Sequence, residues 1–114
     1  MPLLKISTNK EVAPAAQKEF LKEASYRVSK VLQKPEKVVM TLFEPPMPMT
    51  FAGTEEDTAY LEVKSIGLTE DQAGCLAGDI PDLVEKHLAI APDRIYIEFS
   101  DAPRKFWGWN KGTF

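Results

Sequence analysis

The sequence of 114 residues has only one cysteine and one histidine, and it has no long apolar run. Cys75 by itself forms neither an intrachain disulfide nor a Cys-x-x-Cys redox pair. With His87 as the only histidine, the chain also lacks the cysteine and histidine set of a zinc site. The composition therefore predicts no metal centre and no dithiol chemistry.

An excess of positive charge is missing as well. The 14 basic and 17 acidic residues give a net charge of −3, whereas binding to nucleic acid or to an anionic membrane requires clustered Lys and Arg. No segment approaches the ~18 apolar residues of a membrane helix, and the first ten residues lack the apolar stretch of a signal peptide. We expect a cytoplasmic protein that binds neither nucleic acid nor membrane, while secretion without a leader stays open.

The chain contains an internal repeat. Residues 34–43 and 91–100 both read proline, acid, base and then an alternating strand, and they are 57 residues apart. The same offset places residues 2–7 on residues 59–64. The repeat predicts one domain, residues 1–114, built from two β-α-β units at approximately 1–57 and 58–114.

Each repeat carries an amphipathic helix. Thr69 and Gln72 form a capping box before the second helix, and Pro14 suits the first turn of the first. Pro81 lies inside the second helix and is expected to kink it or loosen one turn. The predicted apolar stripes are Phe20, Leu21, Ala24, Val28, Val31 and Leu32 in one helix, and Ala73, Leu76, Ala77, Ile80, Leu83, Val84 and Leu88 in the other.

These elements predict an α+β fold: a four-stranded mixed sheet with both helices on one face, plus short edge strands. The other face is too apolar for a solvated surface, which predicts a homo-oligomer. The residues expected to face the helices are Leu4, Ile6, Val38, Met40, Leu42, Leu61, Val63, Ile95, Ile97 and Phe99. The other face is expected to carry Leu3, Val39, Phe43, Tyr60 and Tyr96.

Pro2 is the main candidate for catalysis. If Met1 is removed, Pro2 begins the chain as a secondary amine, and burial beside a cation would keep that amine neutral enough to act as a general base. If Met1 is retained, the Pro2 nitrogen is an amide and has no basic lone pair. The alternative from the residues alone is that Pro2 simply begins an edge strand.

Seven short motifs occur in order along nearly the whole chain: Met1-Pro2, Thr8-Asn9, Gln33-Lys34-Pro35, Phe51-Ala52-Gly53, Ser65-Ile66-Gly67, Pro92 to Ile97, and Gly108-Trp109-Asn110 with Thr113-Phe114. Together they resemble the macrophage migration inhibitory factor family of the tautomerase superfamily. The resemblance implies a trimeric tautomerase-like fold, with two β-α-β repeats in each subunit and active sites at the subunit interfaces. It also implies a cofactor-free keto–enol tautomerase that acts on small aromatic α-keto acids such as phenylpyruvate.

The resemblance assigns roles to individual residues. Pro2 is the catalytic base, and Lys34 binds the substrate carboxylate or polarises a carbonyl oxygen. Ile66 offers its backbone N–H, and Tyr96 enters the pocket from a neighbouring subunit. The substrate's aromatic group would pack against the tail aromatics Trp107, Trp109 and Phe114. The alternatives are a lysine placed by the helix dipole at Lys34 and interface packing for the tail.

The sequence departs from the family pattern at several positions. Glu98 replaces the family's asparagine, and its carboxylate would oppose an anionic substrate and raise the pKa of the Pro2 amine. The stretch Thr58 to Leu61 replaces the Cys-x-x-Cys of some members, so no thiol oxidoreductase activity is expected. Arg104 and Lys105 add cations before Trp107. A second function class stays open: a cytokine-like or other protein-binding trimer, including receptor binding, in which catalysis is vestigial.

Overall fold

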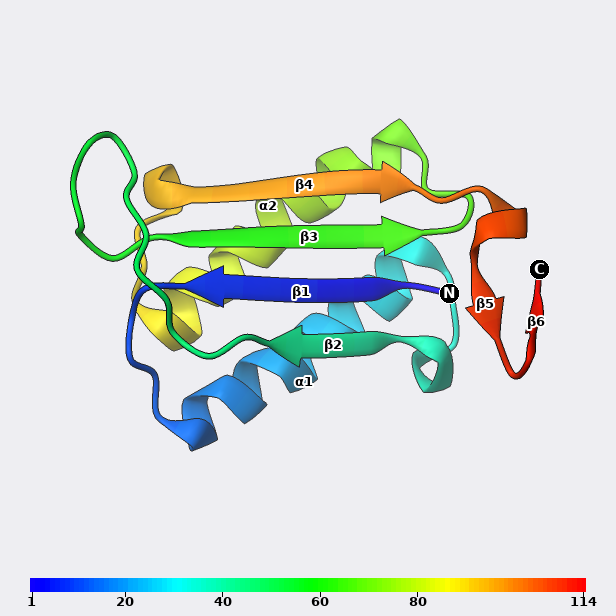
Figure 1. Cartoon of the computed structure of the whole chain (residues 1–114), viewed down its shortest axis with the longest axis horizontal. Helices are drawn as coiled ribbons and strands as arrows, with labels where there is room; N and C mark the ends of the chain where they lie inside the picture. Colours follow the sequence, from blue (N-terminus) through cyan, green and yellow to red (C-terminus); the bar gives the residue numbers. More distant parts are fainter.

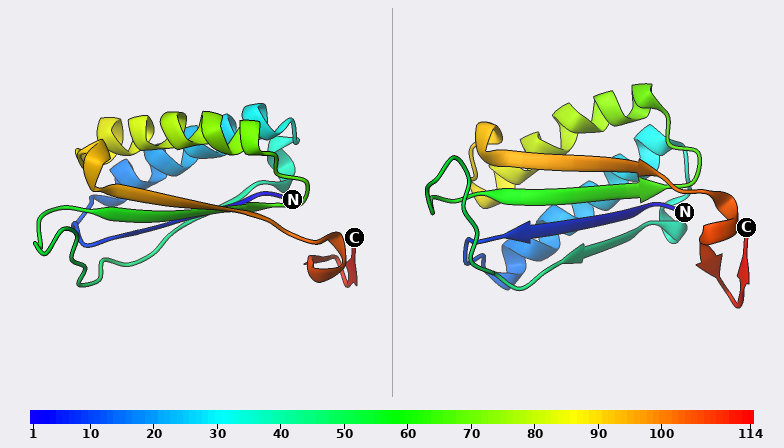
Figure 2. Two further views of the ribbon diagram at one scale, coloured as in Figure 1. Left: turned by 90° about the horizontal axis from the view of Figure 1, so that it is seen from above. Right: turned by 45° about the horizontal axis from the view of Figure 1, so that its top comes forward.

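The computed structural model describes residues 1–114 as two helices packed on one face of a four-stranded sheet (Figure 1). The chain order is β1 (Leu3–Thr8), α1 (Pro14–Leu32), β2 (Met40–Phe43), β3 (Ala59–Ser65), α2 (Glu70–Leu88) and β4 (Ile95–Asp101). The sheet order is β2-β1-β3-β4, with both outer pairs parallel and the central pair antiparallel. The predicted α+β class and the mixed sheet are confirmed, and Figure 2 shows the second sheet face uncovered.

Short elements complete the chain. Three 3-10 turns, η1 (Glu36–Val38), η2 (Pro92–Arg94) and η3 (Arg104–Phe106), precede β2, β4 and the C-terminal tail. The tail forms β5 (Gly108–Trp109) and β6 (Gly112–Thr113), which pair with each other rather than extending the main sheet. This hairpin lies beyond the end of the sheet at which the chain begins (Figure 1).

The helix boundaries follow from local chemistry. Pro14 occupies the first turn of α1, where its missing N–H costs nothing. The Thr69 hydroxyl accepts a hydrogen bond of 3.2 Å from the Gln72 amide, and the Gln72 side chain accepts one of 3.0 Å from the Thr69 amide. The predicted capping box is therefore present. α2 runs unbroken through Pro81, so the proline does not end the helix.

The core lies between the sheet and the helices as one continuous apolar cluster. Phe20 is fully buried and contacts Phe43 edge-on, with ring centroids 6.3 Å apart. The cluster comprises Leu4, Ile6, Phe20, Ala24, Val28, Leu32, Ala59, Leu61, Val63, Leu76, Ile80, Leu83, Val84, Leu88, Ile90 and Ile95.

Neither helix has the length and apolar composition needed to span a membrane.

The prediction for β2 is wrong by one residue. The repeat offset places Met40 and Leu42 under the helices, but they pair with Leu3 and Lys5, on the uncovered face. Met40 is 63% exposed. A shift of one residue moves every side chain of a strand to the opposite face. Val38 belongs to η1 rather than to the strand, and the residues that pack against the core are Val39 and Phe43, which the sequence assigned to the other face.

The cause is an unequal spacing within the repeat. β1 and β3 are related by the predicted 57 residues, since Leu4 and Leu61 both face the core. The helices, which begin at Pro14 and Glu70, are 56 residues apart. The strand pairing shows the same difference: Leu3 pairs with Met40, 37 residues later, whereas Ala59 pairs with Ile95, 36 residues later. The second unit therefore has one residue fewer between its first strand and its helix than the first unit has. This difference inverts the predicted faces of β2.

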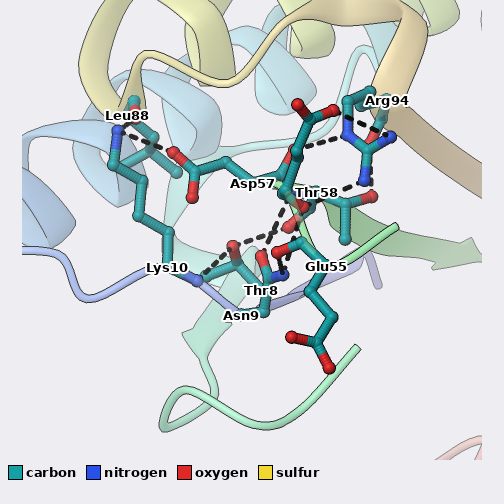
Figure 3. A network of polar contacts seen from close by, with 9 residues as sticks. Thr8, Asn9, Lys10, Glu55, Asp57, Thr58, Leu88 and Arg94 are labelled. Carbon is teal, nitrogen blue, oxygen red and sulfur yellow. Dashed lines mark hydrogen bonds and ion pairs between the residues drawn. The ribbon is translucent and has the colours of Figure 1, made fainter. Parts of the chain in front are cut away.

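Arg94 lies at the end of the sheet far from the chain start, and it connects that end to the loop before β3. Its guanidinium donates to the carbonyl oxygens of Asp57 at 2.9 Å, Glu56 at 2.9 Å and Phe51 at 3.2 Å. It also lies over the Phe51 ring, 5.3 Å from the centroid. Figure 3 shows the Arg94 contacts with this loop beside those of the neighbouring Thr58. The network fixes a loop that has no regular secondary structure.

Candidate active site

A cleft of about 380 Å³ opens where the chain begins, between the start of β1, η1 and the C-terminal tail. The Pro2 side chain is buried, and apolar side chains make up most of the wall. This composition suits a ligand with an apolar or aromatic body. The residues that line the cleft are Met1, Pro2, Leu3, Lys37, Val38, Val39, Met40, Trp107, Gly108 and Trp109.

The chain start is held in place and electrostatically perturbed. The Pro2 carbonyl accepts a hydrogen bond of 3.0 Å from the Met40 amide. Burial lowers the pKa of the Met1 amino group below its usual value, and the positive charge of Lys34 lowers it further. An amine at this place therefore loses its proton more easily than a free chain terminus.

Lys34 follows the C-terminal end of α1. Its amide donates to the Ser29 carbonyl at 3.1 Å, and the Ser29 hydroxyl donates to the Lys34 carbonyl at 2.7 Å. The side chain lines a hollow beside Tyr26 and Glu36 rather than the cleft wall itself. The structure thus brings the charge of Lys34 near the terminal amine without placing the residue among those that line the cleft with Pro2.

Ile66 lies in the turn after β3, at the same end of the sheet as Pro2, because Leu3 pairs with Lys64. Gly67 adopts a φ of +77°, which favours glycine, and its amide donates to the Asp101 carboxylate at 2.8 Å. The Ile66 amide makes no hydrogen bond within the chain. The turn therefore leaves one backbone donor free beside the chain start.

The aromatic tail forms the wall opposite the strands. Trp107 and Trp109 both line the cleft. The rings of Trp109 and Phe114 stack, with centroids 6.3 Å apart and planes inclined by 6°. Phe114 therefore packs against a residue of the cleft wall without lining the cleft itself. Within one chain the fold places Trp107 and Trp109 in the same wall as Pro2.

Tyr96 and Glu98 lie apart from this group. Tyr96 is at the start of β4 and pairs with Tyr60, which in turn pairs with Ser7 near the far end of β1. Tyr96 is 65% exposed, and its ring meets the Phe51 ring edge-on, with centroids 5.0 Å apart. Within one chain, these two residues do not line the cleft that contains Pro2.

Glu98 occupies a charged row on the uncovered sheet face. It pairs across the strands with Glu62, whose carboxylate lies 2.8 Å from the Lys5 ammonium group. Glu98 itself forms no ion pair within the chain. Burial raises the pKa of the nearby Tyr60 hydroxyl, and the charges of Glu62 and Glu98 raise it further. The uncovered face is therefore less apolar than the sequence suggests.

Sequence reasoning missed Lys37. This lysine lies in η1, three residues after Lys34, and it is the only charged side chain among the residues that line the cleft. Its place three residues after Lys34 does not by itself distinguish a lysine that lines a cleft from one that faces solvent. The structure shows no group of three or more His, Cys, Asp or Glu side chains arranged to hold a metal ion.

Two parallel β-α-β units joined through an antiparallel central strand pair form the tautomerase-superfamily fold. A family model described as "Macrophage migration inhibitory factor (MIF)" matches residues 1–114. The chain belongs to the macrophage migration inhibitory factor family, which confirms the resemblance found in the sequence.

Individual relatives agree with this assignment over their full lengths. The rat macrophage migration inhibitory factor is 30% identical over 119 residues, which cover 100% of this chain and 99% of that protein. The Brugia malayi homolog is 34% identical over 118 residues, with the same coverage. The crystal structure of the Prochlorococcus marinus homologue has a TM-score of 0.92 and 41% identity, covering 98% of both chains. The Toxoplasma gondii structure gives 0.94 and 29%, covering 98% of this chain and 99% of that one.

Proposed function

We propose that this protein is a keto–enol tautomerase of small aromatic α-keto acids, of the phenylpyruvate type, with Pro2 as its general base. The observation that carries the proposal is the position of the chain start beside an apolar cleft, where burial and the charge of Lys34 lower the pKa of the Met1 amino group. A base is most effective when its pKa lies near the working pH. The aromatic wall supplied by Trp107 and Trp109 supports an aromatic substrate.

The proposed reaction begins with removal of Met1, which leaves Pro2 as a neutral secondary amine. The Pro2 nitrogen takes a proton from the β-carbon of the keto acid, and the electron pair of the broken C–H bond forms the enol double bond. The protonated amine then gives that proton to the former carbonyl oxygen of the substrate, which becomes the enol hydroxyl. The reverse order converts enol to keto acid, so the cycle neither consumes nor releases a proton.

Two groups at the same end of the sheet would hold the reacting part of the substrate. Lys34 contributes a positive charge for the carboxylate or carbonyl oxygen, and the free Ile66 amide contributes a hydrogen bond. Because both favour the negative charge that develops on the enolate oxygen, they lower the barrier to proton removal. No cofactor is required for a proton transfer next to a carbonyl group.

The active form in this proposal is a homotrimer with active sites at the subunit interfaces. Tyr96 and Glu98 lie on the uncovered sheet face, away from Pro2 of their own chain. Their exposure is compatible with contributions to the cleft of a neighbouring subunit. The trimer would also cover the outer faces of Leu42 and Tyr60.

The test begins with the intact mass of the purified protein, which shows whether Met1 is present. Ketonisation of phenylenolpyruvate is then measured for the unaltered chain, Pro2→Gly and the control Pro48→Gly, whose proline lies exposed in a loop. With Met1 removed, we expect Pro2→Gly to lose at least ~100-fold in kcat/KM, the contribution typical of a general base. Pro48→Gly should retain the parent rate.

The same measurements separate the enzyme from the alternative protein-binding trimer. If Met1 is absent and neither the parent nor Pro48→Gly turns over the enol, catalysis is vestigial and the binding role takes precedence. Equal rates for Pro2→Gly and the parent would contradict Pro2 as the base while leaving an enzyme in place.

A further inference from the structure

Lys37 places an unpaired positive charge in the wall of the cleft. Its side chain is exposed and forms no ion pair with any carboxylate of the chain. Glu36, the nearest acidic residue in the sequence, lines the hollows next to α1 and not the cleft. Nothing within the chain neutralises Lys37 where a ligand would lie.

Lys34 and Lys37 occupy different positions relative to the terminal amine. The charge of Lys34 lowers the pKa of that amine, but Lys34 does not line the cleft. Lys37 lines the cleft and is not among the charges that perturb the amine. Lys34 therefore suits the reacting end of a ligand, whereas Lys37 supplies a second positive charge in the cleft wall itself.

The surroundings of Lys37 favour an anion attached to an apolar body. Pro2, Val39 and Trp109 belong to the same wall, so a ligand held there buries much of its apolar surface away from water. Apolar walls also weaken the screening of a charge pair relative to open water. A cleft of about 380 Å³ falls in the ~300–1,000 Å³ range of ligand pockets and has room for a substituted ring.

We propose that Lys37 forms a second anion subsite, and that the preferred ligand is an aromatic keto acid with an additional carboxylate or other acidic group on its ring. This inference rests on the proposed function for the identity of the reacting keto acid. The subsite itself requires only the cleft and the unpaired lysine, so it can be tested by binding as well as by turnover.

The binding experiment uses two ligands that cannot tautomerise, cinnamate with one carboxylate and 4-carboxycinnamate with two. Isothermal titration calorimetry at fixed ionic strength gives Kd for each, with the full chain and with Lys37→Gln. We expect Lys37→Gln to weaken binding of the dianion about fivefold, the effect of a partly exposed ion pair, and to leave cinnamate unchanged. Equal losses for both ligands, or no loss for either, would overturn the subsite.

Two control variants separate a local subsite from a general field. Lys18→Gln removes the same charge from an exposed position in α1, and Lys105→Gln removes one from η3 beside the tail. Neither residue lines the cleft, so both variants should retain the preference of the parent chain for the dianion. An equal loss in Lys105→Gln would assign the effect to diffuse positive charge and overturn the role of Lys37.

Turnover distinguishes the two proposals. Under the subsite proposal, 4-carboxyphenylpyruvate has a lower KM than phenylpyruvate, and Lys37→Gln removes that advantage without changing kcat. Absence of turnover combined with Lys37-dependent binding of 4-carboxycinnamate would reject the tautomerase and retain the subsite. Turnover of both keto acids with no Lys37-dependent preference would retain the tautomerase and reject the subsite.

Discussion

The backbone amide of Met40 donates a hydrogen bond of 3.0 Å to the carbonyl oxygen of Pro2. This bond ties the chain start to the first residue of β2, and both residues also line the cleft. The bond uses the Pro2 carbonyl and leaves its nitrogen uninvolved. Removal of Met1 would therefore expose a proline amine whose own residue remains anchored in the sheet.

The pH dependence of activity tests the coupling between Lys34 and the amine. A general base works when deprotonated, so kcat/KM should rise with pH through the pKa of the amine and then level off. Burial and the charge of Lys34 lower the pKa of the Met1 amino group, and we expect the Pro2 amine, one residue further along, to respond to the same charge, so Lys34→Gln should move the rise to higher pH. A pH–rate profile for each variant gives the position of the rise.

The control for this prediction is Lys30→Gln. Lys30 lies one turn earlier in α1, over the Tyr26 ring, and does not contribute to the pKa shift of the amine. Its profile should coincide with that of the parent. A rise that stays in place or moves to lower pH in Lys34→Gln would show that the amine does not sense this lysine.

Glu98→Asn should increase turnover of an aromatic α-keto acid severalfold. In the proposed trimer Glu98 lies near the cleft of a neighbouring subunit, where its carboxylate would repel an anionic substrate and raise the pKa of the base, and asparagine removes both effects. Steady-state kinetics with phenylpyruvate measures the change. Glu85→Asn, which alters an exposed position of α2, is the charge-matched control and should leave the rate as it is. An unchanged or lower rate in Glu98→Asn would reject an inhibitory role for Glu98.

Arg94→Ala should destabilise the fold by about 2–3 kcal/mol. The substitution removes three hydrogen bonds to the loop carbonyls of Phe51, Glu56 and Asp57 and leaves these carbonyl oxygens without the Arg94 donor. Urea unfolding measures the change in the free energy of unfolding. Arg104→Ala makes the same replacement at an exposed arginine that forms no ion pair, and should cost less than ~0.5 kcal/mol. Equal costs would show that the network adds no stability.

Thr69→Ala should cost about 1 kcal/mol, because the hydroxyl that accepts from the Gln72 amide is lost from the start of α2. Thr50→Ala is the matched control, since Thr50 is exposed in a loop and does not cap a helix. Thermal or urea unfolding of the two variants gives the comparison. A cost no greater than that of Thr50→Ala would mean that the cap does not stabilise the helix in solution.

Much of the fold was predictable because local chemistry specifies it. Helical spacing of apolar residues identified the buried stripes, in which Phe20, Leu76 and Val84 are fully buried, although Ala77 proved exposed. The proline at the start of α1 and the capping box of α2 are readable from neighbouring residues alone. The β-α-β order then restricts the two helices to one face of the sheet.

The site was less predictable, because it depends on distant segments. Pro2 is at one end of the chain, and Trp107 and Trp109 are near the other. Only the resemblance to relatives indicated that they lie close together in the fold. Lys37 was missed because nothing in its neighbourhood distinguishes a lysine that lines a cleft from one that faces solvent. The partners of Arg94 are three loop carbonyls, and a backbone acceptor leaves no mark in the amino-acid sequence.

The sequence by itself determined the elements, their order and the inward faces of β1, β3 and β4. Only the tertiary structure decided the face of β2, where alternation is clear but its phase is not. A period of two specifies which residues share a face and leaves open which face meets the helices. The hydrogen bond between Met40 and Pro2 settles that choice by fixing β2 against β1, and the same register places Met40 in the cleft beside the candidate base.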